Sequence, residues 1–209
     1  MLILLGLIAS LSLISYSLWK RARGQPPDEA LLAGPTQLRL PGAEPSLSSL
    51  GPGDVVSHLG TDHLVEGVLR LDDDGRLTCL YRMTDGTRVR WLAVRAGADE
   101  PLVCDAVPGL IDPDGLAGHG GSLPGQSTPE QLFHQGAPYR LASRAMVRVE
   151  RVGAVGVLPP ADRAWLCEYA GAGVRRIVAL IWRDRVETFA GEPVARSMIE
   201  VLPGPGLAT

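Results

Sequence analysis

The sequence has few residues of the types that carry metal or disulfide chemistry. Its 209 residues include three cysteines and four histidines, with no CxxC, HxH or HxxxH spacing among them. An odd cysteine count without paired spacing indicates neither a closed disulfide set nor a zinc knuckle, and it fits a reducing cytoplasm. Only a metal site assembled from distant residues would escape this test. The residues concerned are Cys79, Cys104, Cys167, His58, His63, His119 and His134.

Catalytic and phosphate-binding motifs are also missing. There is no GxSxG elbow, and Gly171-Ala172-Gly173 lacks the third glycine of a dinucleotide loop. Asp72-Asp73-Asp74-Gly75 lacks the spaced ligands of a calcium loop, so we interpret it as an acidic hairpin turn. Cys104 with His119 or His134 could in principle form a nucleophilic pair, but no motif or spacing in the sequence supports it. We therefore predict no catalytic, cofactor-binding or metal-binding residues, and a binding role in preference to an enzymatic one.

Lysine is nearly absent: Lys20 is the only one, which we attribute to nucleotide-composition bias. Setting aside Lys20, Arg21 and Arg23 leaves 17 of the 20 basic residues against 23 acidic ones, a net charge of −6. Nucleic-acid phosphates require a basic surface, so this balance argues against a nucleic-acid partner. It also disfavours a broad basic surface for lipid headgroups.

What the sequence does contain is one long uncharged run, Leu2 to Trp19, followed at once by Lys20-Arg21-Ala22-Arg23. Eighteen helical residues span about 27 Å, close to the roughly 30 Å of a bilayer core. A cleaved signal peptide would carry its positive charge before the apolar run, and a buried core helix is the third alternative. Because basic flanks stay on the cytoplasmic side, we predict a single-pass anchor in the plasma or inner membrane, with its N-terminus outside and its body cytoplasmic.

Composition divides the rest of the chain into β-rich and loop-rich regions. Proline, glycine and serine dominate the stretch after the basic flank and a second stretch in the middle, as is typical of linkers. The predicted organisation is an anchor with basic flank (1–23), a linker (24–50), a first β half (51–108), a loop-rich connection (109–130), a second β half (131–203) and a tail (204–209).

Alternating apolar and polar residues predict strands with one buried face and one wet face. Asp74-Gly75 and Asp85-Gly86 are typical of hairpin turns. Only Pro129–Gln135, with a capping box from Thr128 to Gln131, and Glu192–Ile199 are predicted as short helices. The fold class is mainly β, an antiparallel sandwich or a barrel-like body. The predicted strands are Leu64–Leu71, Leu77–Met83, Thr87–Val94, Leu102–Val107, Tyr139–Val157, Ala164–Tyr169, Val174–Trp182 and Val186–Phe189.

The two β halves share a pattern. The segments that begin at Arg76 and Arg163 each place a glycine turn ten residues later, a tyrosine before the turn and an apolar strand after it. Two explanations stay open: an internal duplication, or the turn and alternation signals that any two hairpins share.

The large and charged residues of these strands have a structural interpretation. Trp91, Trp165 and Trp182 are expected in the core, as are the cysteines, because aromatic residues and free thiols are usually buried in β domains. Arginines beside the hairpins are expected on solvated strand faces, with an acidic protein or a lipid headgroup as the alternative partner. These arginines are Arg88, Arg90, Arg175 and Arg176.

Several short motifs resemble a known family. Gly53-Asp54-Val55-Val56, His63–Leu69, Leu80-Tyr81 and Trp91–Val94, with the later Tyr139–Gly153 segment, are similar to the bacterial domain-of-unknown-function family 4178. The resemblance covers most of the region between Gly51 and Pro203. In one departure, Cys79-Leu80-Tyr81 stands where a tryptophan and an acidic residue before the aromatic would be expected. The resemblance implies a mostly β domain, sometimes membrane-associated and found in envelope or membrane-stress systems, with no enzymatic residues.

The functional hypothesis that follows is a membrane-tethered β module that recruits or organises a protein partner at the bilayer. Tethering raises the effective concentration of such a module without requiring high intrinsic affinity. Two alternatives stay open: a ligand-binding or enzymatic domain with a pocket between the β halves, and a structural subunit of a membrane assembly. The ligand-binding alternative requires a deep pocket lined by converging polar groups.

Overall fold

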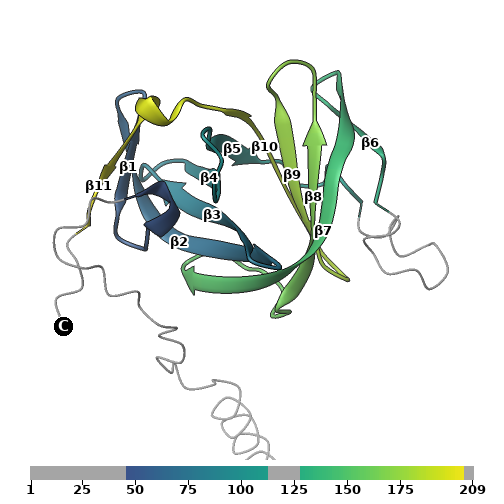
Figure 1. The fold of residues 1–209 in the computed structure, drawn as a ribbon, viewed down its shortest axis with the longest axis horizontal. Coiled ribbons are helices and arrows are strands. Elements are labelled where there is room, and N and C mark those ends of the chain that lie inside the picture. Colours follow the sequence, from purple (N-terminus) through teal and green to yellow (C-terminus); the bar gives the residue numbers. More distant parts are fainter. Residues whose placement is uncertain (1–45, 113–127, 205–209) are drawn as a thin grey trace, which may run out of the picture. The chain divides into compact units, whose positions relative to one another are not determined.

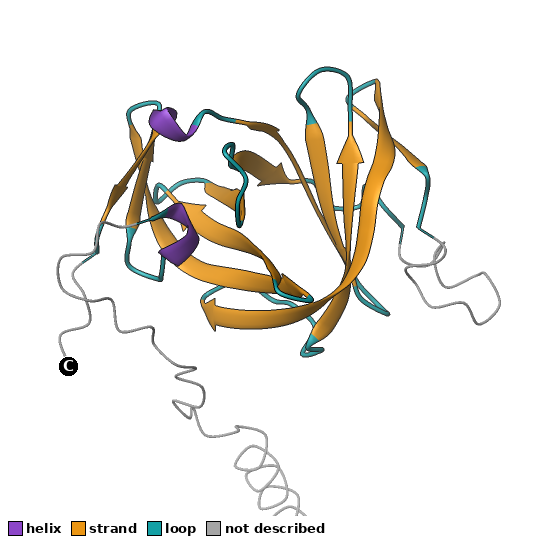
Figure 2. Ribbon diagram, in the orientation of Figure 1, coloured by secondary structure: helices purple, strands orange, loops and turns teal. Residues whose placement is uncertain are grey.

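A computed structural model describes residues 46–112 and 128–204 of the chain. These residues form eleven strands in one continuous antiparallel sheet, with two short 3-10 helices (Figures 1 and 2). The elements are η1 (Leu47–Ser49), β1 (Val55–His58), β2 (Thr61–Asp73), β3 (Arg76–Thr84), β4 (Val89–Arg95), β5 (Leu102–Ala106), β6 (Gln131–His134), β7 (Ala137–Gly153), β8 (Arg163–Ala170), β9 (Arg176–Ile181), β10 (Val186–Pro193), η3 (Arg196–Met198) and β11 (Ile199–Leu202).

Eight of these strands close into a barrel. The sheet runs β2-β3-β4-β5-β10-β9-β8-β7, and β7 pairs again with β2. Two seams therefore join the halves of the chain: β5 pairs with β10, and β2 pairs with β7. β1 and β11 extend the sheet beyond β2, and β6 extends it beyond β7. Of the two architectures that the sequence predicts, the barrel is the observed one.

Glycine allows close backbone approach at both seams. Gly191 of β10 faces β5 so closely that a Cβ atom there would lie 2.1 Å from the carbonyl oxygen of Val103. Gly153, at the end of β7, has φ +72°, and its Cβ would lie 2.5 Å from the carbonyl oxygen of Glu66. Any larger residue would push the paired strands apart, so these glycines permit barrel closure.

The alternation of side chains along each strand gives the barrel one inner core and two outer ones. The inner core draws on all eight barrel strands and includes Leu69, Leu80, Leu166 and Leu180. One outer core lies on β1–β5, where η1 covers it. The other lies on β7–β10, where β6 covers it. The three cysteines are free and buried in these cores, as the sequence predicts.

The eight predicted strands are confirmed with small shifts at their ends, but both helix predictions are wrong. Residues 131–134 form the edge strand β6, because pairing with β7 outweighs the local capping signal at Thr128. The segment 192–199 contains the end of β10 and only the three-residue helix η3. Three strands of four residues each, β1, β6 and β11, were not predicted.

The turns follow their local chemistry. Asp74-Gly75 joins β2 to β3 with φ +47° and +91°, and the Asp72 carboxylate accepts a hydrogen bond from the Gly75 amide at 2.7 Å. The acidic run 72–75 is therefore a hairpin turn, as interpreted from the sequence. The connection between β3 and β4 is longer than predicted, because it spans residues 85–88 instead of two.

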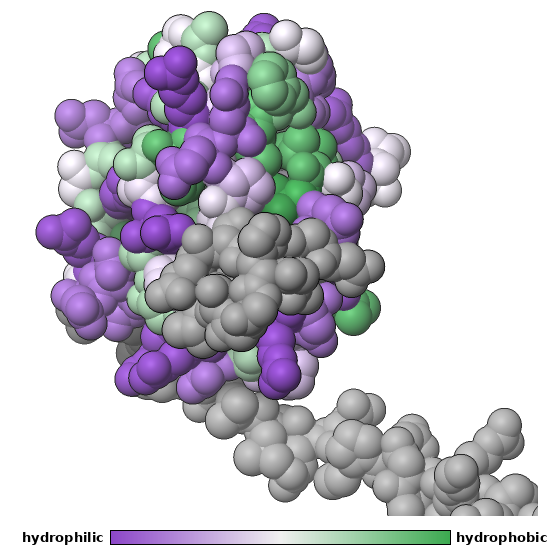
Figure 3. Space-filling view, turned by 90° about the vertical axis from the view of Figure 1, so that its right-hand side faces the viewer, coloured by the Kyte–Doolittle hydropathy of each residue, from purple (hydrophilic) through white to green (hydrophobic). Residues whose placement is uncertain are grey.

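The side of the barrel that carries β6 is mainly hydrophilic (Figure 3). Hydrophobic residues gather in a smaller area in the upper part of that view. Phe133 on β6 is one of the exposed large apolar residues, at 67%. This edge strand is only four residues long, and short edges limit pairing with other chains.

The predicted anchor at residues 1–23 and most of the linker at 24–50 lie outside the described residues, as does His119. In the parts of the chain that the structure does describe, no helix has the length and apolar character needed to cross a bilayer. The single-pass topology, the cytoplasmic body and the protein partner remain predictions.

Candidate functional site

The two ends of the barrel interior differ in how they are filled. At one end, here called the closed end, large side chains meet: Trp91, Leu180, Trp182, Phe189 and Arg151. The rings of Trp91 and Phe189 lie 4.8 Å apart between centroids, and Trp182 is 3% exposed. The Arg151 guanidinium donates hydrogen bonds of 2.6 Å to the carbonyl oxygens of Pro159 and Ala161. Large side chains therefore fill this end of the interior.

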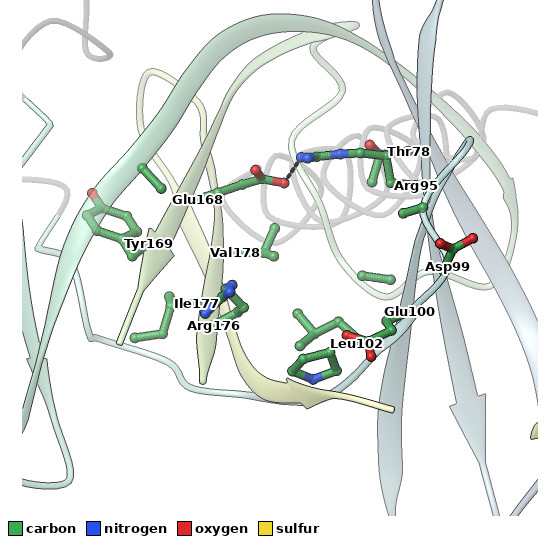
Figure 4. Close-up of a pocket in the computed structure, with 14 residues that line it drawn as sticks. Thr78, Arg95, Asp99, Glu100, Leu102, Glu168, Tyr169, Arg176, Ile177 and Val178 are labelled. Atoms are coloured by element: carbon green, nitrogen blue, oxygen red, sulfur yellow. Dashed lines mark hydrogen bonds and ion pairs between the residues drawn. The ribbon is translucent and has the colours of Figure 1, made fainter. Parts of the chain in front are cut away.

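The opposite end holds a cavity of about 510 Å³, here called the mouth pocket (Figure 4). Its volume is within the range of roughly 300–1,000 Å³ that small-molecule sites occupy, and eight-stranded barrels can hold one small ligand. Both halves of the chain contribute to it. The lining residues are Thr78, Ala93, Arg95, Ala98, Asp99, Glu100, Leu102, Ala142, Glu168, Tyr169, Arg176, Ile177, Val178 and Pro193.

Small side chains create this space. Ala93 stands two residues after Trp91 on β4, so the same face of the strand changes from a large ring to a methyl group. Thr78 on β3 and Ala142 on β7 are also small. Leu102 and Val178, 8% and 6% exposed, supply an apolar surface from the two halves of the chain. The mouth pocket is therefore a consequence of side-chain volume along strands that are otherwise regular.

An ion pair crosses the mouth pocket from one half of the chain to the other. The Arg95 guanidinium on β4 contacts the Glu168 carboxylate on β8 (Figure 4). The second oxygen of Glu168 accepts a hydrogen bond of 2.8 Å from the Ser143 hydroxyl on β7. Both oxygens of this carboxylate are thus engaged. Because the Arg95 side chain is 50% exposed, solvent screens the pair, and such pairs contribute about 0–1 kcal/mol.

The remaining charges of the mouth pocket lie apart from one another. Arg176 at the start of β9 stands on one side of the cavity, whereas Asp99 and Glu100 from the β4–β5 connection stand on the other (Figure 4). Within residues 46–112 and 128–204, none of these three side chains forms an ion pair. The Arg176 guanidinium donates one hydrogen bond of 3.0 Å, to the Arg175 carbonyl oxygen. The cavity therefore presents positive and negative groups on facing walls.

The cysteines do not supply a nucleophile. Burial raises the pKa of the Cys104 thiol to about 12, and burial also raises the pKa of Cys79 and Cys167. A raised thiol pKa disfavours the reactive thiolate. Cys104 lies in the inner core, whereas His134 lies on the edge strand β6, so the structure does not bring this pair together.

Two histidines that the sequence left scattered lie in neighbouring strands. His58 on β1 and His63 on β2 are 7% and 2% exposed, beside the outer core of β1–β5. Burial, and next the nearby Arg90 guanidinium, lowers the pKa of both imidazoles. A positive neighbour also opposes cation binding. Among the described residues, no group of three or more potential ligands could hold a metal ion.

The arginines of the sequence analysis have different environments. Arg88 contacts Asp105 and Arg175 contacts Glu192, and both arginines are exposed, as predicted. Arg90 also contacts Asp105, but its side chain is only 27% exposed. Arg176 is exposed, as predicted, and it lines the mouth pocket. Trp91 and Trp182 are core residues, while Trp165 is half-buried with the Arg144 guanidinium 5.9 Å from its ring.

Sequence reasoning did not identify the central pair, Arg95 and Glu168. A signal was present, because each is a charged residue next to a run of buried strand residues, WLAV before Arg95 and LC before Glu168. A charged side chain at such a position points into the interior or out to solvent, depending on whether and how the sheet closes into a barrel. Only the pairing of the strands decides between these two directions.

Comparison with known proteins adds one match. The family described as "Domain of unknown function (DUF4178)" matches residues 51–196, which include every barrel strand and the whole lining of the mouth pocket. Searches of curated proteins and of solved structures found no match.

Proposed function

The chain belongs to the DUF4178 family of domains of unknown function, and from the geometry of the barrel we propose that it binds a small amphipathic molecule in the mouth pocket. The observation that carries this proposal is a cavity of about 510 Å³ with an apolar floor and charged groups at its rim. Ala93, Leu102 and Val178 would contact the apolar part of the ligand. Arg176, Asp99 and Glu100 would orient its polar part.

The proposed role is binding in preference to catalysis. Glu168 is the carboxylate held by both Arg95 and Ser143, an arrangement that fixes its position. The thiols are buried with raised pKa values and do not line the cavity. If residues 1–23 anchor the chain as predicted, the barrel would present this pocket near a bilayer.

The test is a binding titration of the full-length chain with hexanoate, hexylamine and hexanol, followed by calorimetry and by chemical shifts of mouth-pocket amides. We expect at least one of the three to bind. Ala93→Phe should weaken that binding at least tenfold, because the ring occupies the cavity. Ala161→Phe adds the same bulk at an exposed position of the other end and should leave binding unchanged.

Two results would contradict the proposal. One is the absence of binding by these compounds and by the zwitterions described below. The other is equal loss of binding in Ala93→Phe and Ala161→Phe, which would place the ligand outside the mouth pocket.

A further inference from the structure

Some charged side chains of the mouth pocket form ion pairs within the protein and others do not. Those without an ion pair are the ones that a ligand could contact. Glu168 is engaged by Arg95 and by the Ser143 hydroxyl. This carboxylate therefore does not compensate Arg176, although both side chains line the same cavity. Arg176 keeps an unpaired positive charge with respect to the described residues.

The contrast with Arg175 shows that this arrangement is specific to one position. The neighbouring guanidinium of Arg175 lies 3.4 Å from the Glu192 carboxylate and does not line the cavity. β9 otherwise consists of buried apolar residues after Arg176. One arginine of the pair is thus compensated on the outer surface, while the next one faces the mouth pocket.

Negative charge lies on the opposite wall. Asp99 and Glu100 line the cavity from the β4–β5 connection, and Figure 4 shows them across the pocket from Arg176. A molecule with a single negative charge would leave both carboxylates without a partner. A molecule with a single positive charge would leave Arg176 without one.

The floor supplies a further polar group. Thr78 is 8% exposed, lines the cavity, and its hydroxyl forms no hydrogen bond with any described residue. Its oxygen is not fully buried, so it is accessible from the cavity. A ligand atom in the cavity could bond to this hydroxyl beside the apolar surface of Leu102 and Val178.

From these observations we propose that the mouth pocket selects a zwitterion: an anionic group contacts Arg176, an ammonium group contacts Asp99 and Glu100, and a short apolar segment lies between them. This inference rests on the proposed binding function and specifies its ligand class. Arg176, Asp99 and Glu100 are exposed, so a ligand that lacks one charge loses one of the two ionic contacts and leaves the other protein group hydrated. A free peptide and a phosphoethanolamine headgroup share this chemistry.

The experiment titrates the full-length chain, kept in a neutral maltoside detergent, with leucylleucine, N-acetyl-leucylleucine and leucylleucine amide. We expect the unmodified dipeptide to bind at least tenfold more tightly than either derivative. A second arm compares glycerophosphoethanolamine with glycerol phosphate, which lacks the ammonium group. Charge-dependent binding in the first arm identifies a peptide-like source, and in the second a lipid headgroup.

Variants assign each charge. Arg176→Gln should abolish the preference for leucylleucine over its amide, and Asp99→Asn combined with Glu100→Gln should abolish the preference over the N-acetyl form. If glycerophosphoethanolamine is the ligand that binds, the same variants should remove the contribution of its phosphate and of its ammonium group. Arg175→Gln, which removes the adjacent paired guanidinium, is the matched control and should keep both preferences.

Equal affinity for the charged and the derivatised probes would overturn the zwitterion inference while leaving the proposed binding function intact. The same holds if only hexanoate, hexylamine or hexanol binds. If Arg176→Gln weakens leucylleucine and its amide by the same factor, the arginine does not contact the carboxylate and the inference also fails. Absence of binding by every probe would reject both proposals together.

Discussion

The two ends of one barrel are built from the same eight strands and have opposite character. On β4 the inner face carries Trp91 at the closed end and Ala93 near the mouth pocket, a difference of one side-chain alternation. On β10 the corresponding change runs from Phe189, 1% exposed, to Gly191. Strand pairing is continuous along both elements. Side-chain volume, and not the backbone, therefore decides which end is filled.

The polar groups of the two ends also differ. At the closed end, one nitrogen of the Arg151 guanidinium donates to two backbone carbonyl groups, whereas its Nε and the Trp182 Nε1 are buried and have no hydrogen-bond partner among the described residues. At the mouth pocket, charges are paired only in part, since Arg176 faces Asp99 and Glu100 across the cavity. The polar groups without partners at the closed end are therefore covered by side chains, whereas those of the mouth pocket are accessible to a ligand.

The largest expected effect is on the free energy of unfolding, when the same leucine-to-alanine substitution is made at each end of the barrel. Leu180→Ala removes a fully buried side chain from the inner core and should lower the free energy of unfolding by about 4 kcal/mol. Leu102→Ala removes a side chain that already borders the cavity, so about 2 kcal/mol is expected. Urea unfolding measures both, and equal losses would mean that the mouth pocket is as tightly packed as the closed end.

The second prediction concerns the loss of stability in acid, because buried histidines lie at the end of β1 and near the start of β2. His58 and His63 have folded pKa values below the usual 6.5, so below about pH 6.5 the unfolded chain binds protons that the folded chain does not. Stability should therefore be complete above pH 6.5 and fall as the pH is lowered, until the folded pKa is reached. The full loss is about 1.4 kcal/mol per pKa unit of lowering for each histidine.

The measurement is urea unfolding between pH 7.5 and 5, with hydrogen exchange to locate the change. His58→Gln combined with His63→Gln should flatten the pH dependence, whereas His134→Gln on the edge strand β6 serves as control. Exchange should increase first in β1 and the start of β2. An unchanged slope in the double variant would refute the assignment.

The smallest predicted effects are those of two ion pairs. Arg82–Glu66 has side chains 23% and 29% exposed, and Arg95–Glu168 has 50% and 23%. Because solvent screens the second pair more, a double-mutant cycle should give a coupling of about 1 kcal/mol for the first and about 0.5 kcal/mol or less for the second. Arg70–Glu150, at 3.5 Å on the outer surface, provides the reference cycle. A larger coupling for Arg95–Glu168 than for Arg82–Glu66 would contradict this order and mean that the pair across the mouth pocket stabilises the fold.

The sequence predicted the longer strands well because their alternation extends over many residues. The eight barrel strands were found, whereas VVSH, QLFH and IEVL are too short for a period to stand out. The segment 131–134 shows the limit most clearly. Thr128 and Pro129 have the local chemistry of a helix start, yet β7 offers a strand edge that satisfies the backbone hydrogen bonds better.

The site was not predictable for a related reason. Arg95 and Glu168 are 73 residues apart in the chain and meet because β5 pairs with β10 and β2 with β7. Nothing in either local segment specifies these seams. The sequence analysis named a pocket between the two β halves as an alternative, but not its residues. Arg176 is exposed, as interpreted from the sequence, but only closure places it beside the mouth pocket.

By itself the sequence determined the mainly β composition, the hairpin at Asp74-Gly75 and the burial of the cysteines, because alternation, turn chemistry and hydrophobicity act over a few neighbouring residues. Tertiary structure alone decided the closure of the barrel, its filled end and its open one. These properties depend on which side chains share the interior, and that set is assembled from strands far apart in the chain. The mouth pocket exists because closure brings small and charged residues of both halves to one end.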